Sequence, residues 1–239
     1  MRLVVETEEI KKNLERVLGQ IRDACGRVGR DPAGVTLITV TKTFDLGVVE
    51  RAIEAGAADL GENYVQEAKE KIEGMPGSGA GGVRWHFIGH LQRNKSRYAV
   101  KLFDLIHSVD GLPLAVELDR RAKGVGKVQE ILVQVNISHE ERKSGIEVSG
   151  VVDLVRGIST LENLKVRGLM GMPPFGLDTE EVRPFFTALR ELLEKIKAEN
   201  IPGVSMDELS MGMSADYPVA IEEGATMVRV GTAIFGQRR

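Results

Sequence analysis

Hydrophobic residues near the N-terminus recur with the spacing of a helix that buries one face. Thr7 precedes them as a candidate N-cap, and two glutamates follow it in the first turn. The apolar positions at this spacing are Ile10, Leu14, Val17, Leu18, Ile21, Cys25 and Val28. The pattern predicts one amphipathic helix that ends between Gly26 and Gly29.

From Val35 onward, short β-branched and apolar runs alternate with segments of helical period. The predicted strands are Val35 to Thr41, Ala57 to Gly61, Val83 to Ile88, Leu102 to Val109, Val128 to Val135, Leu164 to Met170, Met206 to Ser210 and Met227 to Val230. The helices between them are expected to centre near Val49, Ala68, Tyr98, Val116, Leu154, Leu189 and Ala220. The chain therefore reads as eight strands with a helix in each gap.

Continuous apolar strands joined by helical crossovers predict a parallel sheet that is buried on both faces. Eight such units close naturally into a barrel, whereas a doubly wound open sheet usually has fewer strands. The eighth predicted strand lies close to Arg239, so we expect one domain over residues 1–239. The predicted fold class is α/β, a (β/α)8 TIM barrel with an extra N-terminal helix.

Composition and net charge argue against nucleic acid and membrane as partners. The hydrophobic content of 42% and the charged content of 28% are those of an ordinary soluble protein. A net charge of −3 argues against a general nucleic-acid binder, and no apolar stretch is long enough to span a membrane. Because the first residues turn acidic before any apolar signal region forms, we expect a cytoplasmic protein.

The cysteine and the histidines suggest no metal or redox site. Cys25 is the single cysteine, which rules out an internal disulfide, and its place on an apolar stripe predicts a buried small hydrophobe rather than a catalytic thiol. His86, His90, His107 and His139 are not spaced as a ligand cluster with carboxylates, so no metal is expected. His86 lies within a predicted strand and is expected to pack in the core.

One glycine-rich segment resembles a phosphate loop only superficially. The residues from Gly74 to Gly82 follow a predicted helix and precede a predicted strand. A dinucleotide or nucleoside-triphosphate loop needs the opposite order. We expect a flexible surface loop on the N-terminal side of the barrel.

The carboxyl ends of the strands, where barrels carry their function, are rich in polar residues and glycine. The first strand leads into Lys42. An ammonium at the mouth of an apolar strand is either a solvated cap or a reactive amine whose pKa the surroundings have lowered.

The segments after the last two strands suggest an anion site. Ser210–Ser214 follows the seventh strand, and Gly231 and Thr232 follow the eighth. Barrels often hold phosphate groups there through backbone N–H groups and a helix N-terminus. The alternative is that Ser214 only caps a helix that continues through Tyr217.

Closure of the barrel brings the first strand beside the eighth, so Lys42 lies opposite this anion site, and Arg229 points inward. Pyridoxal 5'-phosphate has the matching groups: a phosphate, an aldehyde that forms a Schiff base with lysine, and a ring nitrogen that needs a partner. A guanidinium cannot accept a proton from that nitrogen, so the ring would be a weak electron sink. The alternative for Arg229 is an ion pair that closes the top layer of the barrel.

Several segments, in this order along the chain, resemble the pyridoxal-phosphate homeostasis protein family: VTKTF, LGENYVQE, WHFIGHLQRNK, HSVDG, KSGI, GLMGMPP and LSMGMSADYPVAIEEGATMVRVGTAIFG. Members of that family resemble the N-terminal barrel domain of bacterial alanine racemases. The resemblance implies that Lys42 carries the Schiff base and that Arg229 faces the ring nitrogen. It also implies that Ser214, Gly231 and Thr232 hold the phosphate.

The same resemblance places further residues around the cofactor. Asn63, in GENY, and Met170, in GLMGM, are expected to line the ring, and His90 is expected to form a wall or to fix a loop. The family usually has serine before the lysine, where this chain has Thr41, a change that should be tolerated.

The implied function is storage, buffering or delivery of pyridoxal 5'-phosphate. A racemase needs two acid/base groups on opposite faces of the substrate, and in the racemases the second is a tyrosine from a C-terminal domain that is not expected here. Only Tyr64 among the tyrosines lies at a strand end, so no catalytic residue is predicted. We expect a monomer whose partners are the cofactor and, transiently, apo-enzymes that depend on it. The alternatives are a single-domain racemase of low activity and a barrel that binds another phosphorylated metabolite.

Overall fold

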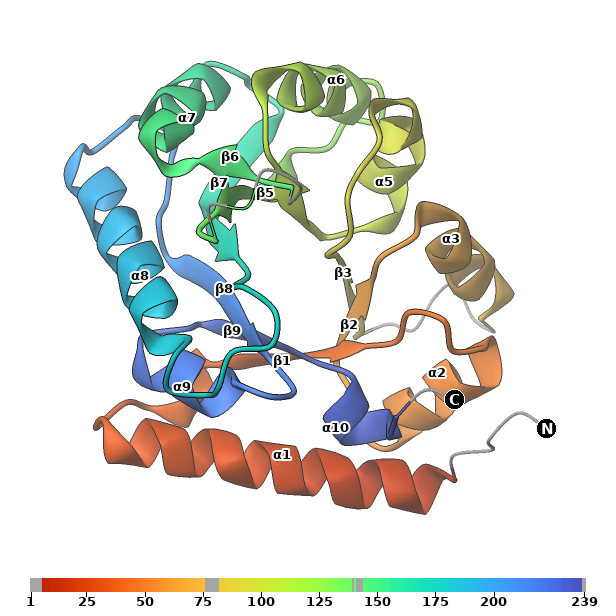
Figure 1. Cartoon of the computed structure of the whole chain (residues 1–239). Coiled ribbons are helices and arrows are strands. Elements are labelled where there is room, and N and C mark those ends of the chain that lie inside the picture. Colours follow the sequence, from red (N-terminus) through yellow and green to blue (C-terminus); the bar gives the residue numbers. More distant parts are fainter. Residues whose placement is uncertain (1–5, 76–81, 139, 141–143, 238–239) are drawn as a thin grey trace.

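The protein is a closed barrel of eight parallel strands, seen along its axis in Figure 1. The computed structural model describes residues 6–75, 82–138, 140 and 144–237. The barrel strands are β1 (Thr36–Val40), β2 (Asp59–Glu62), β3 (Arg84–Phe87), β4 (Leu105–Val109), β5 (Gln129–Asn136), β7 (Leu164–Gly171), β8 (Glu208–Met213) and β9 (Met227–Val230). Pairing of β1 with β9 and of β4 with β5 closes the barrel.

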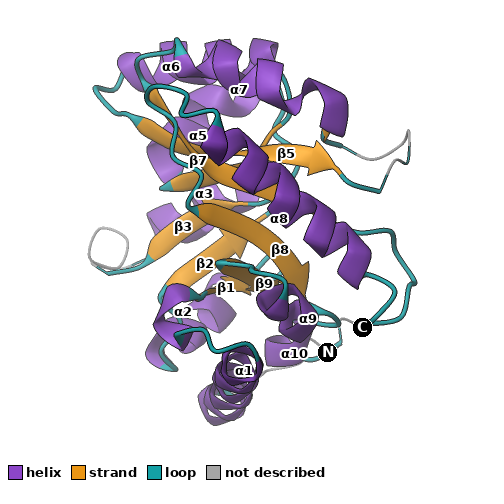
Figure 2. Ribbon diagram, turned by 90° about the vertical axis from the view of Figure 1, so that its left-hand side faces the viewer, coloured by secondary structure: helices purple, strands orange, loops and turns teal. Residues whose placement is uncertain are grey.

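A helix fills each gap between consecutive barrel strands, and Figure 2 shows these helices outside the sheet. They are α2 (Leu46–Glu54), α3 (Val65–Gly74), α5 (Ser96–Leu102), α6 (Leu112–Lys123), α7 (Val151–Ser159), α8 (Arg183–Ala198) and α9 (Tyr217–Glu222). Each predicted strand overlaps an observed one, and each predicted helix centre lies within an observed helix. The predicted TIM barrel is confirmed.

Three short helical turns and one short strand also lie between these elements in the described residues. The 3-10 turns are η1 (Pro32–Gly34), η2 (Arg93–Lys95) and η3 (Val148–Gly150). The two-residue strand β6 (Ile146–Glu147) pairs with the carboxyl end of β5 and is not one of the eight barrel strands. The pattern of the sequence did not predict β6.

The extra N-terminal helix, α1 (Thr7–Arg27), is also confirmed, and it packs against the last βα unit and α2. Its buried face includes Cys25, which is inaccessible to solvent as expected. The Asn13 side-chain amide donates to Ile234 O at 2.9 Å, and Arg16 donates to Ala233 O at 2.7 Å. These bonds attach α1 to α10 (Thr232–Phe235), a short helix after the eighth barrel strand that the sequence pattern did not predict.

Side chains inside the barrel form a separate apolar cluster from those between the sheet and the helices. It contains Ile38, Leu105, Leu132, Met170 and Met227, with Met172 packed against it. The larger cluster lies between the sheet and its helices and contains Trp85, Phe87, Phe103 and Phe186 among its aromatic members. The interior cluster fills the barrel below the carboxyl ends of its strands. We call the region enclosed by these strand ends and the segments that follow them the mouth of the barrel.

Some expectations fall outside the described residues. The centre of the Gly74–Gly82 segment and His139 are among them, so the prediction of a surface loop stays a prediction. In the parts of the chain that are described, no helix is long and apolar enough to cross a membrane. The same residues contain no group of three or more histidine, cysteine or acidic side chains arranged to hold a metal ion.

Candidate functional site

The register of β1 and β9 places Lys42 beside the segment that follows β9. Ile38 is paired with Arg229 and Thr39 with Val230, both in parallel register. Pairing with β2 continues past the end of β1, because Thr41 donates its backbone N–H to Gly61 O at 3.0 Å. Ile38 packs inside the barrel, and Lys42 follows the last residue of β1, Val40, by two positions. Lys42 is half-buried.

A buried cluster of Thr41, Glu62 and Lys71 fixes the backbone on one side of Lys42. Thr41 Oγ1 donates to Glu62 Oε1 at 2.6 Å, and Lys71 Nζ donates to the same carboxylate oxygen at 2.6 Å. Lys71 Nζ also donates to Thr41 O at 2.9 Å. A serine hydroxyl can make the same bond to Glu62, which explains how serine and threonine are both compatible with this position.

The other side of Lys42 is held as well. Thr43 has a φ of 67°, the left-handed region that costs a β-branched residue energy. Its N–H donates to Glu67 Oε2 at 3.0 Å, and that carboxylate lies 3.7 Å from Lys71 Nζ. Burial raises the pKa of Glu62, while Lys71 and Thr41 act in the opposite direction. Two acidic side chains and one lysine thus determine the backbone at residues 41 to 43.

The predicted phosphate residues lie together after β8 and β9. Ser214 Oγ accepts the N–H of Gly231 at 3.3 Å and that of Ala233 at 3.2 Å. Thr232 is exposed at the first position of α10. Two backbone N–H groups therefore converge on one hydroxyl, which keeps its own proton to donate to an oxyanion.

Ser214 lies three residues before the start of α9 and does not cap it. The helix begins at Tyr217 and its N-cap is Asp216, so the alternative that Ser214 only caps this helix is not supported. Asp216 Oδ1 accepts the N–H of Met213 at 2.6 Å, which closes a turn before the helix. This turn directs Ser214 toward the N-terminus of α10 instead of toward α9.

Arg229 is buried inside the barrel, as predicted. Its Nη1 donates to Ser210 Oγ at 2.6 Å and its Nη2 to Gly171 O at 3.1 Å. These partners are a hydroxyl and a carbonyl rather than a carboxylate, so the alternative of an ion pair closing the barrel is not supported. Burial lowers the pKa of Arg229 to about 10, which still leaves the guanidinium charged at neutral pH.

Met170, Asn63 and His90, the further residues expected around the cofactor, differ in how deeply they are buried in the structure. Met170 is fully buried in the interior cluster, below the mouth. Asn63 follows β2 and is half-buried, and its Oδ1 is enclosed without a hydrogen-bond partner among the described residues. His90 is exposed and lines a cavity of about 510 Å³ together with Asn63 and Tyr64. Neither Lys42 nor Arg229 lines this cavity, so the role of His90 as a wall of the cofactor site stays a prediction.

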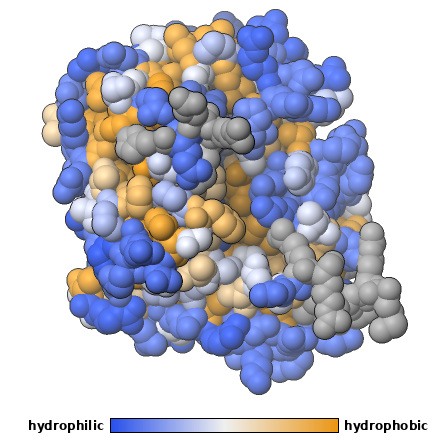
Figure 3. All heavy atoms as spheres, viewed as in Figure 1, coloured by the Kyte–Doolittle hydropathy of each residue, from blue (hydrophilic) through white to orange (hydrophobic). Residues whose placement is uncertain are grey.

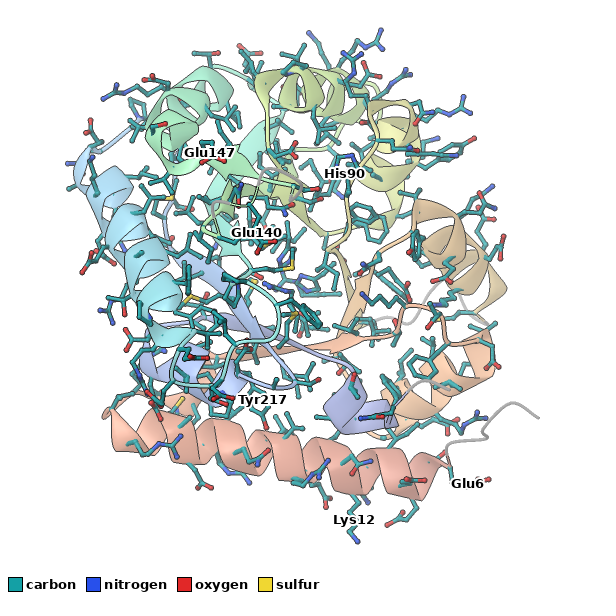
Figure 4. All side chains as sticks on the ribbon, in the orientation of Figure 1. Glu6, Lys12, His90, Glu140, Glu147 and Tyr217 are labelled. Carbon is teal, nitrogen blue, oxygen red and sulfur yellow. The ribbon has the colours of Figure 1, made fainter. Side chains whose placement is uncertain are left out.

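The carboxyl face of the barrel presents this region to solvent. Figure 3 shows hydrophobic atoms in the centre of the visible face and hydrophilic side chains around the rim. Figure 4 labels His90, Glu140 and Glu147 on the same face. Glu147 Oε1 accepts from Asn136 Nδ2 at 2.9 Å, which joins β6 to the end of β5.

Sequence reasoning missed four buried polar residues near the site. Glu62 and Lys71 fix the chain around Lys42, and His107 and Ser210 lie behind Arg229. The signal that was available is a polar residue inside an otherwise apolar buried run, as in LIHSV and ELSMGM. Lys71 carried no such signal, because a lysine on an amphipathic helix usually faces water.

A parallel barrel with a strand-end lysine beside a cluster of backbone N–H groups defines the class of protein: a barrel of the alanine racemase N-terminal type. The family model described as "Alanine racemase, N-terminal domain" matches residues 12–239. The structure of an alanine racemase from Clostridium difficile 630 has a TM-score of 0.74 at 14% identity, covering 99% of this chain and 60% of that one. At that identity the likeness concerns the fold alone.

Relatives that match this chain over nearly its whole length identify its family within the alanine racemase N-terminal class. A pyridoxal phosphate homeostasis protein of Aquifex aeolicus is 42% identical over 95% of this chain and 98% of its own length, and one of Escherichia coli K12 is 40% identical over 96% and 97%. The chain belongs to the pyridoxal phosphate homeostasis protein family. PipY of Synechococcus elongatus, solved with pyridoxal phosphate bound, has a TM-score of 0.82 at 35% identity, covering 95% of this chain and 100% of that one.

Proposed function

We propose that this protein binds pyridoxal 5'-phosphate as a Schiff base on Lys42 and stores, buffers or delivers it. The observation that supports this most strongly is the pairing of β1 with β9, because it brings the end of β1, which leads into Lys42, alongside the segment whose N–H groups donate to Ser214. The names of the full-length relatives and the cofactor in the PipY structure support the same ligand.

The residues present fit the cofactor group by group. Its aldehyde condenses with a primary amine and releases water, which assigns Lys42 to attachment. Its phosphate fits the donors around Ser214, Gly231 and Thr232. Its ring nitrogen fits a donor such as Arg229, and Asn63 and Met170 are proposed to line the ring. We propose that residues 1–239 act as one cofactor-binding domain.

Binding without robust catalysis follows from the same groups. Arg229 can donate a hydrogen bond to the ring nitrogen but cannot accept its proton, so the ring remains a weak electron sink. Tyr64, the tyrosine at a strand end, is 58% exposed on the rim of the mouth. A side chain so accessible to water is poorly placed as the second base of a racemase.

Handling of the cofactor also requires release. The mouth opens on the carboxyl face, so transient contact with an apo-enzyme there would allow transfer. We further propose that the protein acts as a monomer. The cytoplasmic location expected from the sequence stays a prediction.

Attachment is tested by reducing the cofactor-loaded protein with borohydride and mapping the pyridoxyl adduct by peptide mass spectrometry. The adduct is expected on Lys42. Lys42→Arg keeps the charge and removes the primary amine, so it should lose the adduct and the visible absorbance of the Schiff base. Lys69→Arg on the outside of α3 is the matched control and should retain both. An adduct of unchanged yield in Lys42→Arg would overturn the assignment.

The absence of robust catalysis has its own test. Amino acids incubated with the loaded protein in heavy water should not exchange their α-hydrogen faster than with free cofactor. Enzyme-dependent exchange that disappears in Lys42→Arg would instead support a racemase-like enzyme.

A further inference from the structure

A continuous line of buried polar groups crosses the barrel behind the proposed site. Asp59 Oδ1 lies 2.9 Å from His86 Nε2, and His86 Nδ1 lies 3.0 Å from His107 Nε2. His107 Nδ1 lies 2.9 Å from Ser210 Oγ, which accepts from Arg229 Nη1 at 2.6 Å. The line therefore joins the amino end of β2 to the guanidinium beneath the mouth.

The groups in this line are mostly buried, so water cannot satisfy a donor or acceptor that the line leaves unpaired. His86 and His107 are both inaccessible to solvent, as is Ser210. Asp59, at the other end, keeps 18% of its side chain exposed, and Arg84 Nη1 lies 3.9 Å from the same carboxylate oxygen. An unsatisfied donor or acceptor in such a place is costly, so every proton in the line needs an acceptor.

The two ends fix where the protons lie. A guanidinium can only donate, and a carboxylate can only accept. Because Ser210 Oγ accepts from Arg229, its own proton is free to go to His107 Nδ1. His107 then carries its proton on Nε2 and donates to His86 Nδ1, and His86 in turn donates from Nε2 to Asp59.

The opposite direction leaves groups unsatisfied. If His107 donated to Ser210, the serine hydroxyl would have no acceptor among its observed partners. His86 would then present a bare Nε2 to the carboxylate of Asp59, unless it became a cation. Burial, followed by the charges of His86, Arg229 and Arg84, holds the pKa of His107 well below its ordinary value. A neutral His107 agrees with the first direction.

We propose that Asp59, His86, His107 and Ser210 are positioning residues that form a one-directional hydrogen-bond chain and hold the Arg229 guanidinium toward the cofactor ring. This role rests on the proposed function, since Arg229 is assigned there to the ring nitrogen. The direction of the chain itself is a property of the protein without cofactor. Asp59 acts at a distance, through three intervening side chains.

The direction is tested on the unloaded protein by two-dimensional NMR of ¹⁵N-labelled histidine at pH 7.5. His86 and His107 should each appear as the neutral Nε2–H tautomer, and exposed His90 gives the reference for an averaged ring. Detection of an Nδ1–H tautomer or a cation at either buried histidine would overturn the proposal.

A pair of variants at the far end tests transmission. Asp59→Asn retains an oxygen that can accept from His86, so the tautomer of His107 should be unchanged. Asp59→Leu removes the acceptor, and His107, which Asp59 does not touch, should then show a measurable Nδ1–H population. An unchanged His107 spectrum in Asp59→Leu would show that the chain does not act as a unit.

The consequence for the ligand is measured separately. Ser210→Ala removes the acceptor of Arg229 Nη1, and pyridoxal phosphate should dissociate about ten-fold faster, the effect of losing one bond to a charged group. An unchanged dissociation rate would contradict the positioning role. If the tautomers are as proposed but the protein takes up no cofactor, the proposed function fails while the hydrogen-bond chain stands.

Discussion

Lys42 depends on its neighbours for its position. The Thr41 hydroxyl donates to Glu62, and the Thr41 carbonyl accepts from Lys71. The N–H of Thr43, a residue with a strained positive φ, donates to Glu67. Strain of this kind persists only where surrounding contacts over-determine the backbone. The contacts that hold the backbone around Lys42 therefore belong largely to residues that are not proposed to touch the cofactor.

Two threonines on β1 provide a matched test of this cluster. Thr41→Val removes a buried bond to a charged group and should lower the free energy of unfolding by about 2 kcal/mol. Thr39 is equally buried, but its Oγ1 has no hydrogen-bond partner among the described residues, so Thr39→Val should be neutral or stabilising. Urea denaturation of the two variants measures both. Equal destabilisation would show that the bond from Thr41 to Glu62 contributes nothing specific.

His107 should make the protein sensitive to acid. Its folded-state pKa is lowered by burial, so the unfolded chain binds a proton first as the pH falls below about 6.5. The stability that His107 contributes is present above that pH and is lost below it. Between pH 7.5 and 5.5, wild type should lose about 1.4 kcal/mol more than His107→Gln.

The comparison uses urea denaturation of each protein at the two pH values, so that other titrating groups cancel. His90→Gln serves as the exposed-histidine control and should behave like wild type. A loss in His107→Gln as large as that of wild type would mean that other groups cause the acid sensitivity.

At the scale of elements, α1 connects the start of the chain to the end of the barrel. It covers α9 and α10, and its side chains bond to carbonyl groups of α10. Because N–H groups at the start of that short helix donate to Ser214, α1 indirectly supports the proposed phosphate site. Figure 1 shows α1 lying along this side of the barrel.

Two leucines one turn apart test the packing of α1. Leu14 is 4% exposed and Leu18 is 42% exposed. Leu14→Ala should cost about 3 kcal/mol through lost burial and the cavity left behind, whereas Leu18→Ala should cost less than about 1 kcal/mol. Denaturant midpoints measure the two variants. Similar costs would mean that the buried face of α1 has been assigned incorrectly.

The elements that the sequence predicted well are those with strong periodicity. The apolar run at Val128 to Val135 matches β5 within a residue, because a strand buried on both faces leaves a continuous apolar signal. α10 was missed, since four residues are too short to show a helical period. β8 runs three residues beyond its prediction, through Gly212, whose φ of 89° belongs to the irregular register with β9.

At the scale of the molecule, the alternation of apolar strands and amphipathic helices was enough to predict a closed barrel. Closure pairs β1 with β9, and this pairing brings the end of β1 alongside the segment that follows β9. The polar line through the interior could not be predicted in the same way. His86 was expected to be a packed core residue, and it is buried, but its bond to His107 depends on the register between β3 and β4. Hydrophobic periodicity carries no information about which polar side chains meet across a barrel.

The same limit applies to Ser214. Its residue type and its place after the seventh strand predicted an anion site, but the direction of its side chain depends on the turn closed by Asp216. Local turn geometry of this kind is decided by individual hydrogen bonds. The sequence therefore pointed to Ser214 as a candidate, but it could not predict the contacts that orient its side chain.

The most direct measurement is a crystal structure of the protein grown with pyridoxal 5'-phosphate. We predict continuous electron density from Lys42 Nζ to the cofactor and a phosphate about 3 Å from the nitrogen of Gly231 and from Ser214 Oγ. Cofactor joined to a different lysine, or a phosphate bound away from the β9–α10 junction, would contradict the account.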